Sequence, residues 1–219
     1  MAIILCLETA TTNCSVGIAR NGKIVSLKED NSKSYSHAEK LHLFINEALE
    51  EAGITIADLD AIAISKGPGS YTGLRIGVSA AKGLCFSLDI PLISVPTLDL
   101  LAYKLKGKTG IFISMLDARR MEVYSSVYDS KINQIRETKA EVLDEQSFTE
   151  YLEQSQVHFI GNGVAKFEDI CTYTNAVFHK QKFPSAQEMA EIAELKYQKS
   201  DIEDVAYFEP YYLKDFIAG

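Results

Sequence analysis

Long apolar runs are missing from this sequence. The apolar stretch at the start of the sequence covers only residues 2–7. No basic segment precedes it, and Glu8 follows it directly. A membrane helix needs about 20 apolar residues, and a secretory signal peptide needs a basic start followed by an apolar core. The opening therefore excludes an ordinary signal peptide or membrane span, and we expect a soluble, cytoplasmic protein with no membrane partner.

Cysteine is scarce, and no two cysteines form a C-x-x-C pair. The four cysteines are Cys6, Cys14, Cys85 and Cys171, and the two nearest in sequence are eight residues apart. We interpret them as small buried hydrophobic residues in a reducing compartment, ahead of a metal or disulfide role.

Basic residues are in the minority. The chain has 22 Lys and Arg against 30 Asp and Glu, a net charge of -8. Alone it would repel a phosphate backbone, so any nucleic-acid role needs a more basic partner. One basic cluster stands out, and we expect it to be mostly solvated: Lys104, Lys106, Lys108, Arg119 and Arg120.

Recognisable catalytic and metal-binding motifs are also lacking. His37 and His42 are five residues apart, so on a helix they project about 140° from one another, whereas zinc-binding helices space histidines by four. We interpret both as surface residues. His158 and His179 stand alone, without a G-x-S-x-G or Cys–His signature. We therefore predict no catalytic residues and no metal site.

What the sequence does contain is enough apolar residues for a substantial core, 47% of 219. Periodicity predicts strands at 3–7, 14–20 and 23–29, then a helix at 37–52, a strand at 61–64, a helix at 72–86, a strand at 91–95 and a helix at 97–105. Further strands are expected at 111–116, 121–128, 131–138 and 157–160, with helices at 145–154, 163–172 and 185–199.

The two halves of the chain repeat one pattern. Residues 4–8 and 113–117 both form an apolar strand that ends in a carboxylate, and each precedes another strand and a hairpin. We expect an N-terminal subdomain over 1–106 and a C-terminal one over 107–219, whose aromatic tail can return to the first. Two βββαβα-type halves resemble the α/β actin-like ATPase fold (ASKHA, ribonuclease H-like), which by itself implies no activity.

The stretch 65–83 concentrates glycine and small residues between a strand and a helix. Gly73, Gly77 and Ala81 share one helix face, and each helical glycine costs about 1 kcal/mol relative to alanine. Such a face suggests that another backbone approaches closely. That backbone could belong to a partner, which we favour, or to the chain's own sheet.

A nucleotide site in this architecture needs a phosphate cradle from each half. The first half offers Thr9, Thr11 and Thr12 as candidates for a vestigial site, whereas residues 117–120 of the second half lack glycine. We favour a turn and capping role for the threonines and expect no cofactor. The Gly-Asn-Gly triplet at 161–163 could contact adenine, but such triplets are usually only turns.

Four segments carry a more specific resemblance. Gly-Pro-Gly-Ser-Tyr-Thr-Gly-Leu-Arg-Ile-Gly at 67–77, Leu-Glu-Thr-Ala at 7–10, Asp-Ala-Arg at 117–119 and Glu-Val-Tyr at 122–124 resemble the TsaB family, also called YeaZ. The likeness is firm over 1–128 and looser through 161–163 to 210–214. Tyr71, where phenylalanine is usual, is a minor departure.

The resemblance implies a non-catalytic subunit of the bacterial machinery that makes threonylcarbamoyladenosine beside the anticodon of ANN-reading tRNAs. It implies binding to the catalytic paralogue TsaD, recruitment of the ATPase TsaE, contact with tRNA only through the complex, and a homodimer when the chain is alone. TsaD carries two metal-binding histidines where this chain has Thr97 and Leu101. The alternatives are a stand-alone actin-fold ATPase or kinase or metallopeptidase-like enzyme, and a homodimeric interaction module without a tRNA role.

We expect the partner surface on the helices 37–52 and 72–86, packed against the equivalent helices of TsaD. The residues assigned to it are Leu41, Leu43, Ile45, Gly73, Leu74, Ile76, Gly77, Ala80, Ala81 and Leu84.

Overall fold

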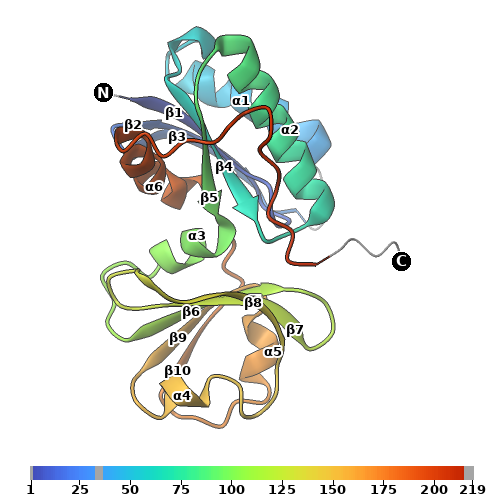
Figure 1. Cartoon of the computed structure of the whole chain (residues 1–219), viewed down its shortest axis with the longest axis vertical. Coiled ribbons are helices and arrows are strands. Elements are labelled where there is room, and N and C mark those ends of the chain that lie inside the picture. Colours follow the sequence, from blue (N-terminus) through green and yellow to red (C-terminus); the bar gives the residue numbers. More distant parts are fainter. Residues whose placement is uncertain (1, 33–36, 215–219) are drawn as a thin grey trace. The chain divides into compact units, whose positions relative to one another are not determined.

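The computed structural model describes residues 2–32 and 37–214, and the chain divides into two compact units. The first comprises Met1–Thr97 and Pro184–Gly219, and the second Leu98–Phe183. Each unit is built on a five-stranded mixed sheet (Figure 1). In the described part of the chain, no helix combines the length and the apolar character needed to cross a bilayer.

The first sheet has the order β3-β2-β1-β4-β5. Its strands are β1 (Ile3–Glu8), β2 (Cys14–Arg20), β3 (Lys23–Asp30), β4 (Ala61–Gly67) and β5 (Leu92–Pro96). β1, β2 and β3 pair antiparallel, whereas β4 runs parallel to both β1 and β5. Asn21 and Gly22 both have positive φ (53° and 70°), as a two-residue hairpin between β2 and β3 requires.

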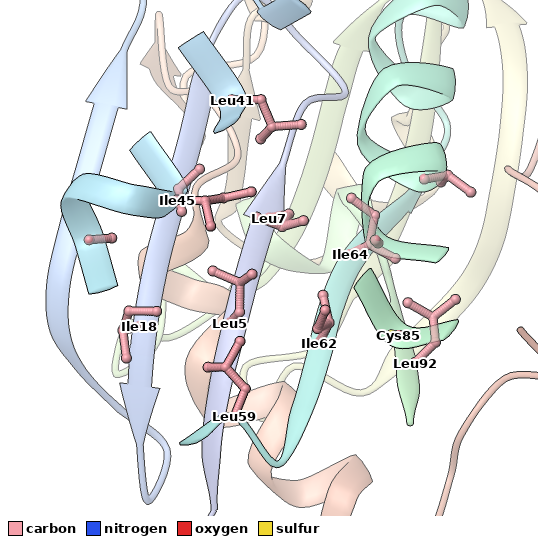
Figure 2. Packing of buried hydrophobic residues seen from close by; sticks show 14 of the residues in the cluster. Leu5, Leu7, Ile18, Leu41, Ile45, Leu59, Ile62, Ile64, Cys85 and Leu92 are labelled. Carbon is pink, nitrogen blue, oxygen red and sulfur yellow. The ribbon is translucent and has the colours of Figure 1, made fainter. Parts of the chain in front are cut away.

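One face of this sheet is covered by α1 (His37–Glu51) and α2 (Tyr71–Leu88), and a short 3-10 helix, η1 (Ile56–Asp58), precedes β4. The helices pack on alternate residues of the strands, because successive strand side chains point to opposite faces. Figure 2 shows this core, which includes Leu5, Leu7, Ile18, Leu41, Ile45, Ile62, Ile64 and Cys85. Burial raises the pKa of the Cys85 thiol to about 12, which fits a cysteine that serves as a small apolar residue.

Helix α6 (Ala186–Gln198) also packs on the first sheet, against β1, β2 and β5. Ser185 is its N-cap, with Oγ accepting from Gln187 N, and Ser15 Oγ on β2 accepts from Ala186 N at 2.9 Å. Met189, Ala190 and Ala193 are buried. The last long helix of the chain is therefore part of the first unit, not the second.

The second sheet has the order β10-β9-β6-β7-β8 and repeats the pairing of the first. Its strands are β6 (Ile111–Asp117), β7 (Glu122–Tyr128), β8 (Gln134–Val142), β9 (Val157–Gly161) and β10 (Ala176–Lys180). The helices are α3 (Thr97–Tyr103), which begins at the boundary of the units, α4 (Thr149–Leu152) and α5 (Val164–Glu168). Three antiparallel strands followed by two parallel ones, in both units, confirm the predicted α/β actin-like fold and its internal repeat.

The unit boundary lies elsewhere than the expected division at 106/107. Leu98, Leu101 and Ala102 of α3 are fully buried in a core with Phe112 and Tyr128 of the second sheet. Helix α3 therefore belongs mainly to the second unit, and the chain from Pro184 onward to the first.

Four elements of the second unit differ from the expectation, among them α5, which ends at Glu168 rather than at 172. Strand β8 starts at Gln134 rather than 131, because Asp129 Oδ1 accepts from Lys131 N (2.9 Å) and Asn133 N (2.8 Å) and holds these residues in a turn. The helix expected at 145–154 is reduced to α4. Strand β10 was not predicted, since as a half-buried edge strand it lacks a clear apolar alternation.

Candidate functional site

The glycine-rich loop starts where β4 ends. Gly67 has φ 109°, and its peptide bond to Pro68 is cis. A Cβ at Gly67 would lie 2.6 Å from the Tyr211 carbonyl oxygen, so the C-terminal segment passes directly over this residue. Gly67 N donates to Thr97 Oγ1 at 3.1 Å, which fixes the loop to the start of α3. Glycine is required here by both the backbone angle and the close approach.

Beyond the loop, α2 packs on the turn between β1 and β2. A side chain at Gly69 would overlap Ala10, one at Gly73 would overlap the carbonyl oxygen of Thr9, and one at Gly77 would overlap the Thr9 hydroxyl. Ser70 caps the helix by accepting from Gly73 N at 3.3 Å, while Ser70 N donates to Ala10 O at 2.7 Å. The backbone that approaches the glycine face is therefore the chain's own β1–β2 turn.

This packing contradicts part of the expected partner surface. Six of its residues lie in the core of the first unit: Leu41, Ile45, Gly73, Leu74, Gly77 and Ala81. The α2 residues are buried because the glycine face allows α2 to pack closely on the β1–β2 turn, whereas Leu41 and Ile45 lie on the core-facing side of α1. The other four remain accessible: Leu43 is 52% exposed, and Ile76, Ala80 and Leu84 are half-buried.

The threonines of the β1–β2 turn are directed into the chain itself. Thr9 is fully buried against Gly77, and Thr11 is 5% exposed with Oγ1 accepting from Asn13 N at 3.3 Å. Thr12 Oγ1 donates to Asn31 Oδ1 at 2.8 Å, and Glu8 Oε1 accepts from Ala10 N at 2.5 Å. These contacts fit the turn and capping role and leave poor geometry for a phosphate cradle.

The corresponding turn of the second unit joins β6 and β7. Ala118 N donates to Glu122 O at 3.1 Å and Arg119 N to Asp117 Oδ1 at 2.6 Å, so two amides that could face a phosphate are already engaged. Lys166 Nζ also pairs with Asp117 Oδ1 at 3.0 Å. Neither turn, with these contacts, fits a nucleotide phosphate.

His37 is wrongly predicted as a surface residue. It is 1% exposed, its Nε2 lies 2.7 Å from Thr11 O, and its ring approaches Gly73. Burial lowers its pKa, while the bond to Thr11 opposes that shift. The sequence signal was present, because His37, Leu41 and Ile45 recur every four residues on the buried face of α1. His42, by contrast, is exposed.

The positions equated with metal-binding histidines have structural contacts of another kind. Thr97 is fully buried and accepts the hydrogen bond from Gly67 N, and Leu101 is fully buried in the second unit. Over residues 2–32 and 37–214, no group of three or more His, Cys, Asp or Glu side chains is arranged to hold a metal ion.

Two histidines that are isolated in sequence meet in space. His158 on β9 and His179 on β10 stack with ring centroids 5.3 Å apart, and His158 Nδ1 lies 3.1 Å from His179 Nε2. His158 Nε2 donates to Thr109 O at 3.1 Å, so in the neutral pair Nδ1 accepts the proton of His179 Nε2. Burial, with Lys108 nearby, lowers the pKa of both rings.

Because both histidines have lowered pKa values, we predict that the free energy of unfolding depends on pH. In the unfolded chain both imidazoles are protonated near their ordinary pKa of 6.5, whereas in the folded chain their pKa values are lower. The free energy of unfolding therefore keeps its full value above about pH 6.5 and falls as the pH drops below it. The limiting slope is about 1.4 kcal/mol per pH unit for each such proton. In urea denaturation between pH 7 and 5, His179→Gln should flatten this dependence, and the exposed His42→Gln should not. Equal slopes in both variants would contradict the assignment.

The C-terminal segment, described here over residues 201–214, forms no helix or strand within those residues and lies along one flank of α2. Lys82 Nζ donates to the carbonyls of Ala206 (3.2 Å) and Phe208 (2.8 Å), and Tyr211 N donates to Lys66 O at 2.7 Å. Farther along, the Tyr212 and Tyr71 rings lie 5.2 Å apart. The sequence allowed the aromatic tail to return to the first subdomain, which agrees with these contacts, but it did not indicate α2 as the element that the tail contacts.

The basic cluster is divided in the structure. Lys104, Lys106 and Lys108 precede β6, and Arg119 and Arg120 follow it, about 20 Å away at ~3.3 Å per strand residue. The two groups do not form one stripe, and this distribution gives no support to tRNA binding by the lone chain.

Comparison with known proteins gives matches whose names belong to the same tRNA modification. A family model described as "TsaD: tRNA N6-adenosine threonylcarbamoyltransferase" matches residues 29–218. The chain is 30% identical to the tRNA threonylcarbamoyladenosine biosynthesis protein TsaB of Escherichia coli (strain K12), over 98% of this chain and 96% of that protein. It is 29% identical to the protein of the same name from Haemophilus influenzae, over 97% and 93%.

The fold is also similar to a solved structure. The crystal structure of a Pseudomonas aeruginosa protein, described as uncharacterized with similarity to peptidase YEAZ, matches with a TM-score of 0.84 and 24% identity. The match covers 98% of this chain and all of that one, and at this identity it supports the fold alone.

Proposed function

Because the chain belongs to the TsaB (YeaZ) family of tRNA threonylcarbamoyladenosine biosynthesis proteins, we propose that it serves this pathway as a non-catalytic scaffold subunit. In this proposal it binds TsaD, enables recruitment of TsaE, and meets tRNA only through the complex, in the cytoplasm. TsaD transfers the threonylcarbamoyl group to the adenosine beside the anticodon of ANN-reading tRNAs.

The observation that carries the non-catalytic role is the filled β1–β2 turn. Gly69 of the loop and Gly73 and Gly77 of α2 pack directly on Thr9 and Ala10, so a phosphate has no room to approach that backbone from the α2 side. Thr97 and Leu101 are used for packing and for holding Gly67, and neither can act as an imidazole ligand. The proposal therefore assigns both phosphate and metal chemistry to the partners.

The accessible residues of α1 and α2 support a revised partner surface. Leu43 lies on α1, and Ile76, Ala80 and Leu84 recur every four residues along α2. A Cβ at Gly83 on α2 would meet nothing within 4 Å, so the helix offers a smooth exposed position beside this stripe. We define the TsaD-facing surface as Leu43, Ile76, Ala80, Gly83 and Leu84, and propose the same surface for the homodimer of the lone chain.

The purified chain is expected to be inactive by itself. Incubated with ATP, bicarbonate, threonine and tRNA, it should give no modified adenosine above background, measured by mass spectrometry of nuclease-digested tRNA. Addition of TsaD, TsaE and the enzyme that makes the threonylcarbamoyl adenylate should restore the product. Turnover by the chain alone would favour the stand-alone enzyme, and full activity of the partners without this chain would refute the scaffold role.

A further inference from the structure

Two aromatic rings of the first unit project into solvent. Phe86 on α2 is 85% exposed and Tyr207 in the C-terminal segment is 84% exposed, the highest values among the exposed large hydrophobic residues of the described chain. Single exposed apolar residues are common, but two large rings of one unit exposed to this degree mark a candidate binding surface if they lie on the same flank.

The contacts of Lys82 bring these rings to the same flank of α2. Its Nζ donates to Ala206 O and Phe208 O, the carbonyls on either side of Tyr207. Phe86 lies four residues after Lys82, so the two side chains project within about 40° of one another. Figure 1 shows the C-terminal segment running beside α2.

Local bonds hold the segment in a fixed turn. Asp204 Oδ1 accepts from Ala206 N at 2.8 Å and from Tyr207 N at 3.3 Å, and the neighbouring Phe208 is only 8% exposed. With Phe208 anchored in the core, Tyr207 is left outside. The exposed Tyr207 ring is therefore attached to a backbone turn that hydrogen bonds hold in place.

Exposed carboxylates lie within three residues of each ring in the sequence. Asp89, three residues after Phe86, is exposed, as are Asp204 and Glu209 on either side of Tyr207. The nearby Lys82 is half-buried and donates to backbone carbonyls. The surface is thus an aromatic pair with an acidic rim, and we call it the Phe86–Tyr207 patch.

We propose that the Phe86–Tyr207 patch docks a protein partner that presents an apolar pocket bordered by lysine or arginine. Charge complementarity favours this occupant, because the acidic rim would repel a nucleic acid and an identical patch on a second copy. On α2, Phe86 projects about 120° away from Ala80 of the TsaD-facing surface. Gly83, the residue of that surface nearest to Phe86, projects about 60° from it, so the patch lies beside the TsaD-facing surface rather than within it.

The inference rests on the proposed function, in which a third protein joins the chain and TsaD. TsaE is the probe. We would assemble the chain with TsaD and titrate TsaE with ATP by calorimetry, comparing the wild type with the double variant Phe86→Ser/Tyr207→Ser. Val142→Ser, at a 68% exposed apolar position on β8 of the second unit, is the matched control.

The double variant is expected to weaken TsaE binding at least about tenfold, with TsaD affinity and thermal melting unchanged. Asp89→Asn/Glu209→Gln should weaken it several-fold and reduce its salt dependence, and Val142→Ser should do neither. Unchanged TsaE affinity in the double variant would overturn the inference. Loss of TsaD binding or of self-association would overturn it too, by assigning the patch to TsaD or to a second copy. Failure of the wild-type pair to bind TsaE would instead refute the proposed function, and the inference with it.

Discussion

Gly73→Ala is expected to destabilise the chain by about 3 kcal/mol, because the added methyl group would overlap the backbone carbonyl oxygen of Thr9. That oxygen belongs to the β1–β2 turn, which is tied to α1 by His37 and to the glycine loop by Ser70 N. The turn cannot give way without moving α1 or the start of α2. Urea denaturation followed by circular dichroism, at a dilute protein concentration, measures the change.

Gly83→Ala is the matched control on the same helix. Its Cβ would enter open space, so alanine should stabilise the chain by about 0.5–1 kcal/mol through helix propensity alone. Opposite signs for the two substitutions would establish that the glycine face serves internal packing. If Gly73→Ala were as well tolerated as Gly83→Ala, the face would again be available for a partner.

The glycine face illustrates what one sequence can predict. The spacing of Gly73 and Gly77 correctly indicated the close approach of another backbone. It could not identify that backbone, because glycine is needed both where α2 contacts a turn of its own chain and where it would contact a helix of a partner. Only the position of Thr9 beneath α2 decides between them.

The fold was largely predictable because its signals are local. The Asn21-Gly22 turn and the short alternating strands indicate the hairpins, and the carboxylates Glu8 and Asp117 at matching strand ends reveal the repeat. Contacts between distant segments were not predictable. Helix α6 joins the first sheet through Ser15 and Ser185, which lie 170 residues apart, and no local pattern specifies that pairing.

In the candidate site, too, some residues were identifiable from the sequence, whereas their contacts were not. Thr97 and Leu101 were identified from sequence through the resemblance, but their roles, holding Gly67 N and filling the second core, come from the structure. His158 and His179 were isolated in sequence, and they meet only because β10 pairs in parallel with β9. A residue's neighbours across a sheet depend on strand order, which periodicity does not supply.

Gly83→Arg is expected to leave the chain folded and to abolish its complex with TsaD, with an affinity loss on the order of a hundredfold. Gly83 lies in open space on α2, so the side chain costs the isolated fold little, but it would stand between α2 and any helix packed on the TsaD-facing surface. Gly77→Arg is the contrasting variant, because its side chain would be driven into Thr9 and Ile64, and we expect it to unfold the chain.

Thermal melting and light scattering, with and without TsaD, separate these outcomes. Gln198→Arg, at an exposed position near the end of α6, controls for the added charge and should bind TsaD normally. If the lone chain forms a homodimer through the same surface, Gly83→Arg should also convert it to a monomer. A folded Gly83→Arg variant that still binds TsaD with wild-type affinity would exclude this face of α2 from the interface, and with it the surface proposed from Leu43, Ile76, Ala80 and Leu84.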